Sequence, residues 1–223
     1  MDYHDSNLKD KPVKEISIMI IDDHPVIRHG AKSILDRQEN MSVVAVCSDA
    51  NSALKTIKKL HPDVIVLDIT MAGISGIDLI PHIKNIAKDS AIVIYTMHES
   101  IGYIHRAINA GAKGYVLKID ALSELIQAIQ DTHKGRMYFS RNLPANILDQ
   151  LITGTAEQGV LGNLTPREFE TANLLAQGMS PEEIGKTLFI SPKTVRVHRT
   201  NIMHKLGCKS VTELLLQLND FFS

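Results

Sequence analysis

The sequence predicts a doubly wound α/β domain built on a five-stranded parallel sheet, followed by a small all-α domain of four helices. Two observations predict the first part. Short apolar runs rich in β-branched residues recur along the first 120 residues, and helix-patterned segments separate them. These runs barely alternate between apolar and polar residues, which is typical of strands buried on both faces of a parallel sheet. A third observation predicts the second part, because no strand-like run follows residue 163.

The five expected strands set the order of the first domain. They cover residues 16–21, 43–47, 64–67, 91–95 and 115–117. Helix-patterned segments lie between them near residues 25–38, 49–60, 76–87 and 99–110, and a fifth follows at 121–133. The fifth is the clearest, because its apolar residues recur at helical spacing and form one stripe: Leu122, Leu125, Ile126 and Ile129. Five alternating units predict a domain that covers residues 16–135.

The remaining segments follow from helix starts and from composition. Three starts share one pattern, in which a hydroxyl residue can cap the helix and proline takes the first helical position. They are Thr165-Pro166, Ser180-Pro181 and Ser191-Pro192. We therefore expect a helix-turn-helix domain at residues 164–223. The polar residues 1–15 are interpreted as a flexible arm, and residues 136–163 as a linker with a helix at 143–153.

Composition limits the class of protein. The chain has 223 residues and a formal charge of -1, so it is no general polyelectrolyte and a nucleic-acid site would have to be local. Cys47 and Cys208 are isolated, which favours reduced thiols over a disulfide framework or a zinc site. No apolar stretch approaches the roughly 20 residues of a membrane span. We expect a soluble, cytoplasmic protein without membrane contact.

Charged and hydroxyl residues follow the expected strands at the edge where a doubly wound sheet binds ligands. The first strand ends in Asp22 and Asp23, the third in Asp68, the fourth in Thr96, and the fifth reaches Lys118. Three carboxylates against one lysine leave excess negative charge, which Mg²⁺ would neutralise. A carboxylate beside Mg²⁺ can attack a phosphoryl donor and form an aspartyl-phosphate, while the hydroxyl and the ammonium hold the phosphoryl oxygens.

Long stretches of the sequence resemble a known family. IIDDHPVIRHG, VIVLDITMAGISGIDLI, IVIYTMHES and AGAKGYVLK resemble the flavodoxin-like receiver domain of bacterial response regulators. LTPREFETANLLAQGMSPEEIGKTLFISPKTVRVHRTNIMHKLG resembles a LuxR-type helix-turn-helix. Together they resemble a two-component response regulator of the NarL/FixJ type. The chain departs from that pattern at Ala72 and Ile119, where proline is usual.

The resemblance implies a role for each residue at the strand ends. Asp68 would be the phosphoacceptor. Asp23 would bind Mg²⁺ directly, Asp22 would assist, often through water, and the backbone carbonyl of Thr70 would be a further ligand. Thr96 and Lys118 would contact the phosphoryl group, and the orientation of the Tyr115 ring would report the switch.

One segment of the second domain concentrates positive charge. Residues 191–209 carry five basic side chains and no acid, whereas residues 163–223 as a whole carry seven basic and six acidic ones. The same segment has an apolar side for docking, which favours a recognition helix in the major groove over a merely solvated face. The resemblance places Arg196 and Val197 toward the bases. The other expected DNA contacts are Lys193, Thr194, Arg199, Thr200 and Lys205, of which the lysines and Arg199 are interpreted as phosphate contacts.

The last expected helix leaves two interpretations open. Val211, Leu214, Leu215 and Leu218 form an apolar stripe at helical spacing. The stripe serves the core alone, or the core together with a dimer interface of the kind that paired DNA half-sites require.

The resemblance implies a transcription factor whose phosphorylation by a sensor histidine kinase controls homodimerisation and binding to double-stranded DNA. Because the phosphoryl transfer is self-directed, we do not expect an enzyme with turnover. The main alternative is a receiver that is controlled by protein contacts without phosphorylation and still binds DNA. A phosphatase of the haloacid-dehalogenase type is disfavoured by Thr70, which stands where a second acid is needed. A nucleotide-binding module is disfavoured because Asp22 and Asp23 would repel phosphate.

Overall fold

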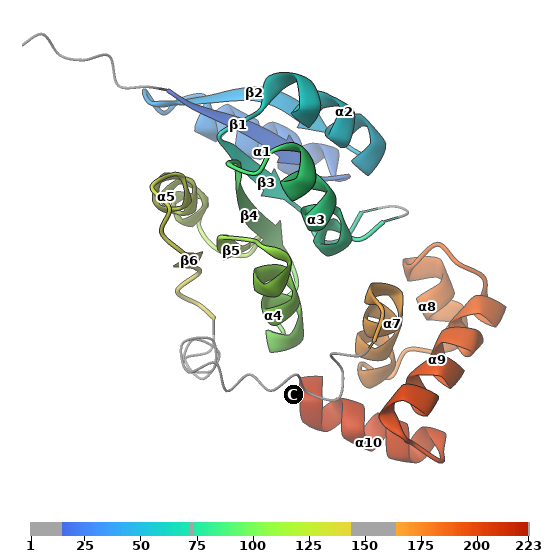
Figure 1. Ribbon diagram of the computed structural model, residues 1–223. Helices are drawn as coiled ribbons and strands as arrows, with labels where there is room; N and C mark the ends of the chain where they lie inside the picture. The colour runs from blue at the N-terminus through green and yellow to red at the C-terminus, as the bar shows by residue number, and fades with distance from the viewer. Residues whose placement is uncertain (1–14, 72–73, 144–163, 223) are drawn as a thin grey trace, which may run out of the picture.

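A single parallel sheet organises the first domain in the computed structural model, which describes residues 15–71, 74–143 and 164–222. The strand order is β2-β1-β3-β4-β5-β6 (Figure 1). The strands are β1 (Ile16–Ile21), β2 (Met41–Cys47), β3 (Val64–Leu67), β4 (Ala91–Thr96), β5 (Gly114–Leu117) and β6 (Tyr138–Phe139). The five expected strands are confirmed, and the crossover between β1 and β3 makes the sheet doubly wound.

The sheet has six strands instead of the expected five. The sixth, β6, pairs in parallel with β5 over two residues, and the buried Ser140 hydroxyl then accepts a hydrogen bond from the backbone N–H of Leu117. Two half-buried residues make no recognisable apolar run, so pattern alone could not detect this strand. It lies in the segment that the sequence assigned to the linker. The helix expected at 143–153 and most of the N-terminal arm fall outside the described residues.

Five helices cover the two faces of the sheet. They are α1 (Pro25–Leu35), α2 (Ala50–Leu60), α3 (Gly76–Ile86), α4 (Ile101–Ala110) and α5 (Leu122–His133). Alternate residues of β1 divide the core, because Ile18 and Ile20 face the cluster that α1 and α5 complete. Met19 and Ile21 face the opposite cluster, to which α2, α3 and α4 contribute. Burial on both faces explains why the strands barely alternate.

Four helices form the second domain: α7 (Pro166–Ala176), α8 (Pro181–Thr187), α9 (Pro192–Leu206) and α10 (Val211–Phe222). The predicted caps are present, with full capping boxes at Thr165 and Ser180 and a hydroxyl cap at Ser191. The core uses one stripe of α9, whose Val195 and Ile202 are fully buried. Among the described residues, no helix has the length and apolar character needed to cross a bilayer.

The two domains meet where α4 faces α7 and the end of α10 (Figure 1). Phe169 of α7 lies against the ring of Tyr103 of α4, with ring centroids 5.0 Å apart, and against Phe222 of α10. The recognition-type helix α9 lies on the side of the helical domain that points away from the sheet (Figure 1). Among the described residues, the α/β domain therefore does not cover the outward face of α9.

Candidate acidic site and nucleic-acid interface

The acidic residues gather at the carboxyl edge of the sheet, beside the point where strand order reverses. Asp22 follows β1 and Asp68 follows β3, its neighbour in the sheet. Backbone hydrogen bonds extend this pairing, because the N–H of Asp68 donates to the carbonyl of Ile21. The parallel register therefore brings two carboxylates, 46 residues apart in sequence, to one place.

Lys118 stands between the two buried carboxylates. Its Nζ lies 2.7 Å from Asp22 Oδ2 and 2.7 Å from Asp68 Oδ2. All three side chains are nearly inaccessible, with 4% of Lys118 and 2% of each aspartate exposed. The lysine reaches both acids although Ile119, and not proline, follows it. One buried ammonium thus compensates for two buried carboxylates, and net negative charge remains.

Burial, opposed by Lys118 and reinforced by the charge of Asp22, raises the pKa of the Asp68 carboxyl to about 6. The backbone N–H of Thr70 also donates a hydrogen bond that favours the charged form. Asp68 is therefore costly to ionise in this site, and a cation bound beside it would stabilise the carboxylate.

Asp23 and His24 complete the cluster. Four residues each offer one possible ligand atom, and these atoms all lie within 4.8 Å of one another: Asp22, Asp23, His24 and Asp68. The Nδ1 of His24 lies 2.8 Å from Asp23 Oδ1 and 3.2 Å from Asp22 Oδ1. The sequence prediction did not include His24, although its position directly after the two acids placed it in reach. The donor set is dominated by carboxylate oxygens, which suit Mg²⁺.

Thr96 and Tyr115 connect to this edge through His98, which the prediction also missed. Thr96 is fully buried, and its Oγ1 accepts a hydrogen bond of 3.3 Å from the N–H of His98. The Tyr115 hydroxyl donates to the carbonyl of His98 at 2.8 Å. The His98 ring is hydrogen-bonded to the Thr70 hydroxyl at 2.7 Å. His98 therefore connects three of the predicted residues, a role that only the fold reveals.

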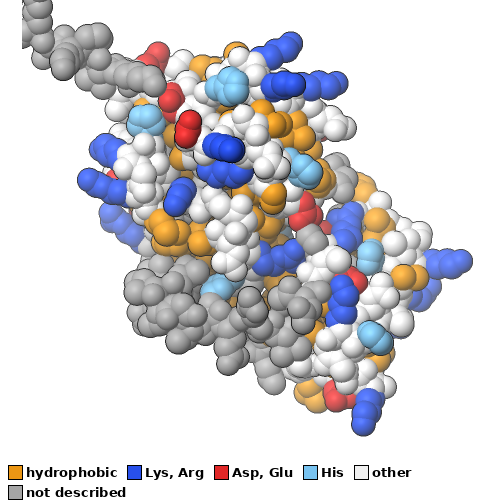
Figure 2. Space-filling model, in the orientation of Figure 1, with side chains coloured by type: hydrophobic (Ala, Val, Ile, Leu, Met, Phe, Trp, Pro, Cys, Tyr) orange, Lys and Arg blue, Asp and Glu red, His pale blue; other side chains and the backbone are white. Residues whose placement is uncertain are grey.

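The predicted DNA contacts lie on α9, and their side chains differ in exposure and in the partners they have inside the domain. Arg196 and Val197 are about half exposed, and Arg196 forms an ion pair of 2.6 Å with Glu182 of α8. Such an exposed pair is worth about 0–1 kcal/mol, so the guanidinium can leave it at little cost. In Figure 2, Lys and Arg side chains gather over the region where Figure 1 draws α8 and α9.

Three other predicted contacts have partners inside the domain. The ammonium of Lys205 lies 2.6 Å from the buried carboxylate of Glu168, so it helps to hold α9 against α7. The Thr200 hydroxyl donates to the carbonyl of Arg196, and the Thr194 hydroxyl lies 2.8 Å from the Ser191 hydroxyl at the helix start. A phosphate contact from Lys205 would require that the ammonium leave Glu168.

Two family models match the chain. The response regulator receiver domain matches residues 18–130. The model of bacterial regulatory proteins of the luxR family matches residues 162–217. The two matches cover the α/β domain and the helical domain respectively.

Similar proteins span nearly the whole chain. The oxygen regulatory protein NreC of Staphylococcus epidermidis is 35% identical over 207 residues, covering 90% of this chain and 95% of that protein. NreC of Staphylococcus carnosus is 34% identical over 206 residues, with the same coverage. The RcsB response regulator of Salmonella typhimurium superposes with a TM-score of 0.64 at 28% identity, covering 94% of this chain and 100% of that one. RcsB of Salmonella enterica serovar Typhimurium bound to a promoter in the presence of the phosphomimetic BeF3- superposes with a TM-score of 0.61 at 27% identity, covering 93% of this chain and 100% of that one.

Proposed function

Since the chain belongs to the response regulators that join a receiver domain to a LuxR-type DNA-binding domain, we propose that it is a transcription factor switched by phosphorylation of Asp68. A sensor histidine kinase would supply the phosphoryl group, Mg²⁺ would be the cofactor, and a homodimer would bind double-stranded DNA. The proposed domains are the receiver at 16–135 and the DNA-binding domain at 164–223, joined by a linker at 136–163.

One observation carries the proposal, namely the buried Lys118 ammonium held at 2.7 Å from both Asp22 and Asp68. A cluster of three acids, two of them buried, around one buried lysine is expensive for a purely structural role, since well-packed apolar residues would be at least as stable. A chain that retains such a cluster at the ligand-binding edge of its sheet is expected to use it.

The residues present fit Mg²⁺. In the described part of the chain, Asp22 Oδ2 is contacted by the Lys118 ammonium at 2.7 Å and has no other hydrogen-bond donor, and Asp23 Oδ1 has only the His24 ring nearby, at 2.8 Å. Both oxygens keep a lone pair for a cation. We expect Asp22, Asp23, Asp68 and the Thr70 carbonyl to hold the ion, which when bound neutralises charge on the phosphoryl oxygens.

The reaction is a displacement at phosphorus. An oxygen of Asp68 forms a bond to the phosphorus atom while the bond from phosphorus to the donor's leaving nitrogen breaks, and the leaving nitrogen retains the electron pair. Lys118, already 2.7 Å from Asp68, would contact one phosphoryl oxygen, and Thr96 would turn its hydroxyl toward another. The chain modifies itself and turns over no separate substrate.

The test is uptake of beryllofluoride with Mg²⁺ by the full chain, followed by isothermal titration calorimetry. Wild type should bind it, and Asp68→Asn should not, because the amide supplies no carboxylate oxygen to the beryllium. Asp89→Asn, an exposed aspartate outside the cluster, is the matched control and should bind like wild type. If wild type binds none, phosphorylation control fails and the receiver controlled by protein contacts alone is favoured.

The DNA-binding half rests on α9. We expect Arg196→Ala to lower discrimination between the preferred operator and a version altered at the contacted base by about 1–3 kcal/mol, because a bidentate arginine reads guanine. Fluorescence anisotropy with both operators measures this difference. Loss of the ion pair with Glu182 should not account for this change in discrimination, since an exposed ion pair contributes little to stability.

Arg199→Ala is the comparison, because we assign Arg199 to phosphate. It should weaken binding to all sequences alike and reduce the salt slope by about one unit. If Arg196→Ala behaves in this uniform way and keeps its sequence preference, the base-reading face has been assigned to the wrong residue.

A further inference from the structure

We propose that Ser140 and Asn142, two residues of the segment after α5, position the Lys118 ammonium for its contact with the phosphoryl group. Together with Leu117 and Asp120, which they bind, they form what we call the turn clamp. The inference rests on the proposed function, and it adds that the segment after α5 is part of the acceptor site. Both positioning residues lie beyond the end of the match to the receiver family.

The turn that carries Lys118 has little support from its own residues. Lys118 and Ile119 are its two central residues, and Asp120 closes it by donating its N–H to the carbonyl of Leu117 at 3.0 Å. Proline would restrict the backbone after the lysine, whereas isoleucine leaves it free. Burial does not fix this position either, because 64% of Ile119 is exposed. Support from outside the turn therefore decides how well the lysine is held.

Ser140 holds the first end of the turn. Its hydroxyl accepts a hydrogen bond of 3.0 Å from the N–H of Leu117, directly before the lysine. The next N–H, that of Lys118, points to the other side and donates to the Thr96 carbonyl of β4 at 2.8 Å. Ser140 is fully buried, so water cannot easily replace its hydroxyl. The end of β5 is thus held on both sides at the point where the turn begins.

Asn142 holds the second end of the turn. Its Nδ2 donates to Asp120 Oδ1 at 2.6 Å. Only 9% of Asp120 is exposed, and its other carboxylate oxygen is buried without a hydrogen-bond partner among the described residues. Hydrogen bonds to a charged group are strong, and leaving such a group unsatisfied in a buried place is costly. Asn142 therefore fixes the residue two positions after Lys118.

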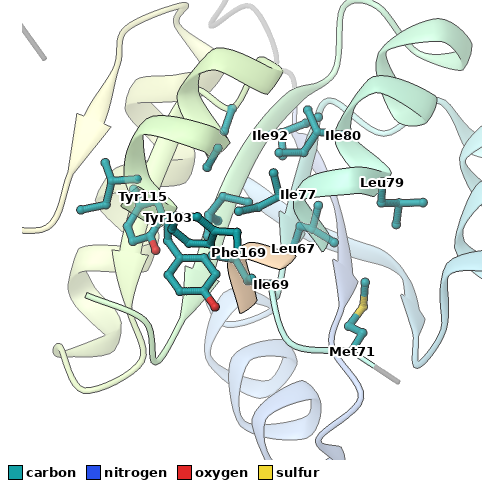
Figure 3. Close-up of a cluster of buried hydrophobic side chains, with 14 of the residues drawn as sticks. Leu67, Ile69, Met71, Ile77, Leu79, Ile80, Ile92, Tyr103, Tyr115 and Phe169 are labelled. Carbon is teal, nitrogen blue, oxygen red and sulfur yellow. The ribbon is translucent and has the colours of Figure 1, made fainter. Parts of the chain in front are cut away.

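The clamp has a rigid base. The short strand β6 pairs with β5, and the N–H of Ser140 donates to the carbonyl of Tyr115 at 2.9 Å. Tyr115 is fully buried in the apolar cluster that Figure 3 shows. The same segment is tied to α5, where the Tyr138 hydroxyl donates to the carboxylate of Glu124. The clamp is therefore anchored in the core of the receiver, and the turn is held against that core.

The clamp should affect the phosphoryl group and not the metal ion. Lys118 would contact a phosphoryl oxygen, whereas the expected ligands of Mg²⁺ follow β1 and β3. A misplacement of about 1 Å can cost a positioned group about a hundredfold in rate, so a loosened turn should also weaken phosphoryl binding. The affinities for beryllofluoride and for Mg²⁺ alone therefore distinguish a misplaced lysine from general damage to the acidic site.

Asn142→Asp in the full chain tests this, because it sets a second carboxylate against that of Asp120. By isothermal titration calorimetry at neutral pH, we expect beryllofluoride with Mg²⁺ to bind about tenfold more weakly than to wild type. Mg²⁺ alone should bind as well as to wild type or more tightly. Asn51→Asp adds the same charge at an exposed position near the start of α2, and it should match wild type in both titrations.

The Asp120→Asn background tests the contact itself. There, Asn142→Asp restores the hydrogen bond with donor and acceptor exchanged, so it should change beryllofluoride affinity by less than about twofold. A tenfold loss that persists in this background would overturn the contact. Ser140→Ala tests the other end of the clamp and should weaken beryllofluoride binding in the same selective way. Its control is Ser33→Ala, at an exposed position of α1, which should bind like wild type.

The remaining outcomes separate this inference from the proposed function. If Asn142→Asp and Ser140→Ala both bind beryllofluoride like wild type, the clamp does not position Lys118, while phosphorylation control stands. If both weaken Mg²⁺ binding as much as beryllofluoride binding, they disturb the whole acidic cluster and the assignment to the lysine is wrong. If wild type binds no beryllofluoride, the proposed function fails and this inference with it.

Discussion

Gly76→Ala should destabilise the receiver domain by about 3 kcal/mol or more, at the upper end of what overpacking costs. A Cβ at this position would lie 1.9 Å from the carbonyl oxygen of Asp68 and 2.9 Å from its carbonyl carbon. These are backbone atoms, so no side chain can rotate away. The start of α3 must shift, and with it the hydrogen bond of 2.8 Å from the Gly76 N–H to Ile69.

Urea unfolding measures the loss, and beryllofluoride titration of the folded fraction measures the damage to the acceptor site. Both should fall together, because the clash lies on the backbone of Asp68, the proposed phosphoacceptor. Gly30→Ala serves as control, because Gly30 lies in α1 and a Cβ added there would have no heavy atom within 4 Å apart from its own chain neighbours and helix backbone; it should be as stable as wild type or gain up to about 1 kcal/mol from helix propensity. An unchanged urea midpoint for Gly76→Ala would show that α3 does not constrain Asp68.

Lys118→Met should lower the free energy of unfolding by about 3–5 kcal/mol at pH 7.5 in a chelator, because it leaves buried carboxylates without their ammonium. The side chains of Asp22 and Asp68 are each 2% exposed, so water cannot screen their repulsion. Thermal or urea unfolding measures the loss. Lys59→Met, an exposed lysine at the end of α2, should change stability by no more than about 0.5 kcal/mol.

The loss should depend on pH in a definite direction. The pKa of Asp68 is already raised to about 6 by burial, and removing Lys118 takes away a group that opposes this shift. A raised folded pKa favours folding below the unfolded pKa, near 3.8, and this advantage disappears as the pH rises through the folded value. The gap between wild type and Lys118→Met should therefore narrow from pH 7.5 toward pH 5. An equal gap at both pH values would contradict the assignment.

The parallel sheet was predictable because strands buried on both faces have continuous apolar runs in the sequence. Runs such as Val64–Leu67 carry no alternation, and helices with one apolar stripe separate them. The caps at Thr165, Ser180 and Ser191 were predictable because the capping groups are local in sequence. By contrast, β6 is held by partners on β5 and by Ser140, none of which is visible in a two-residue segment.

The site residues that follow strand ends were predictable, because parallel strands bring their carboxyl ends to one edge of the sheet. The site residues that loops position were less predictable. The structure brings Asp22, Asp23, Asp68 and Lys118 together as the strand ends suggested. The roles of His24 and His98 depend on loop geometry, and the partner of Lys205 depends on the packing of α9 against α7. The aromatic contact between domains was also beyond prediction, because Tyr103 and Phe169 have the ordinary spacing of core residues.

The short strand β6 also determines how this sheet can meet another. It pairs with one edge of β5, and the Ser140 hydroxyl accepts the hydrogen bond of the Leu117 N–H at the end of that strand, so this edge offers fewer backbone groups to a further strand. In the described part of the chain, β2 is the remaining border, and it exposes 42% of Val44 and 43% of Val46. Unpaired borders of this kind are where sheets add strands and where aggregates begin. Charged substitutions at Val44 or Val46 are therefore the first to consider if the isolated receiver domain proves poorly soluble.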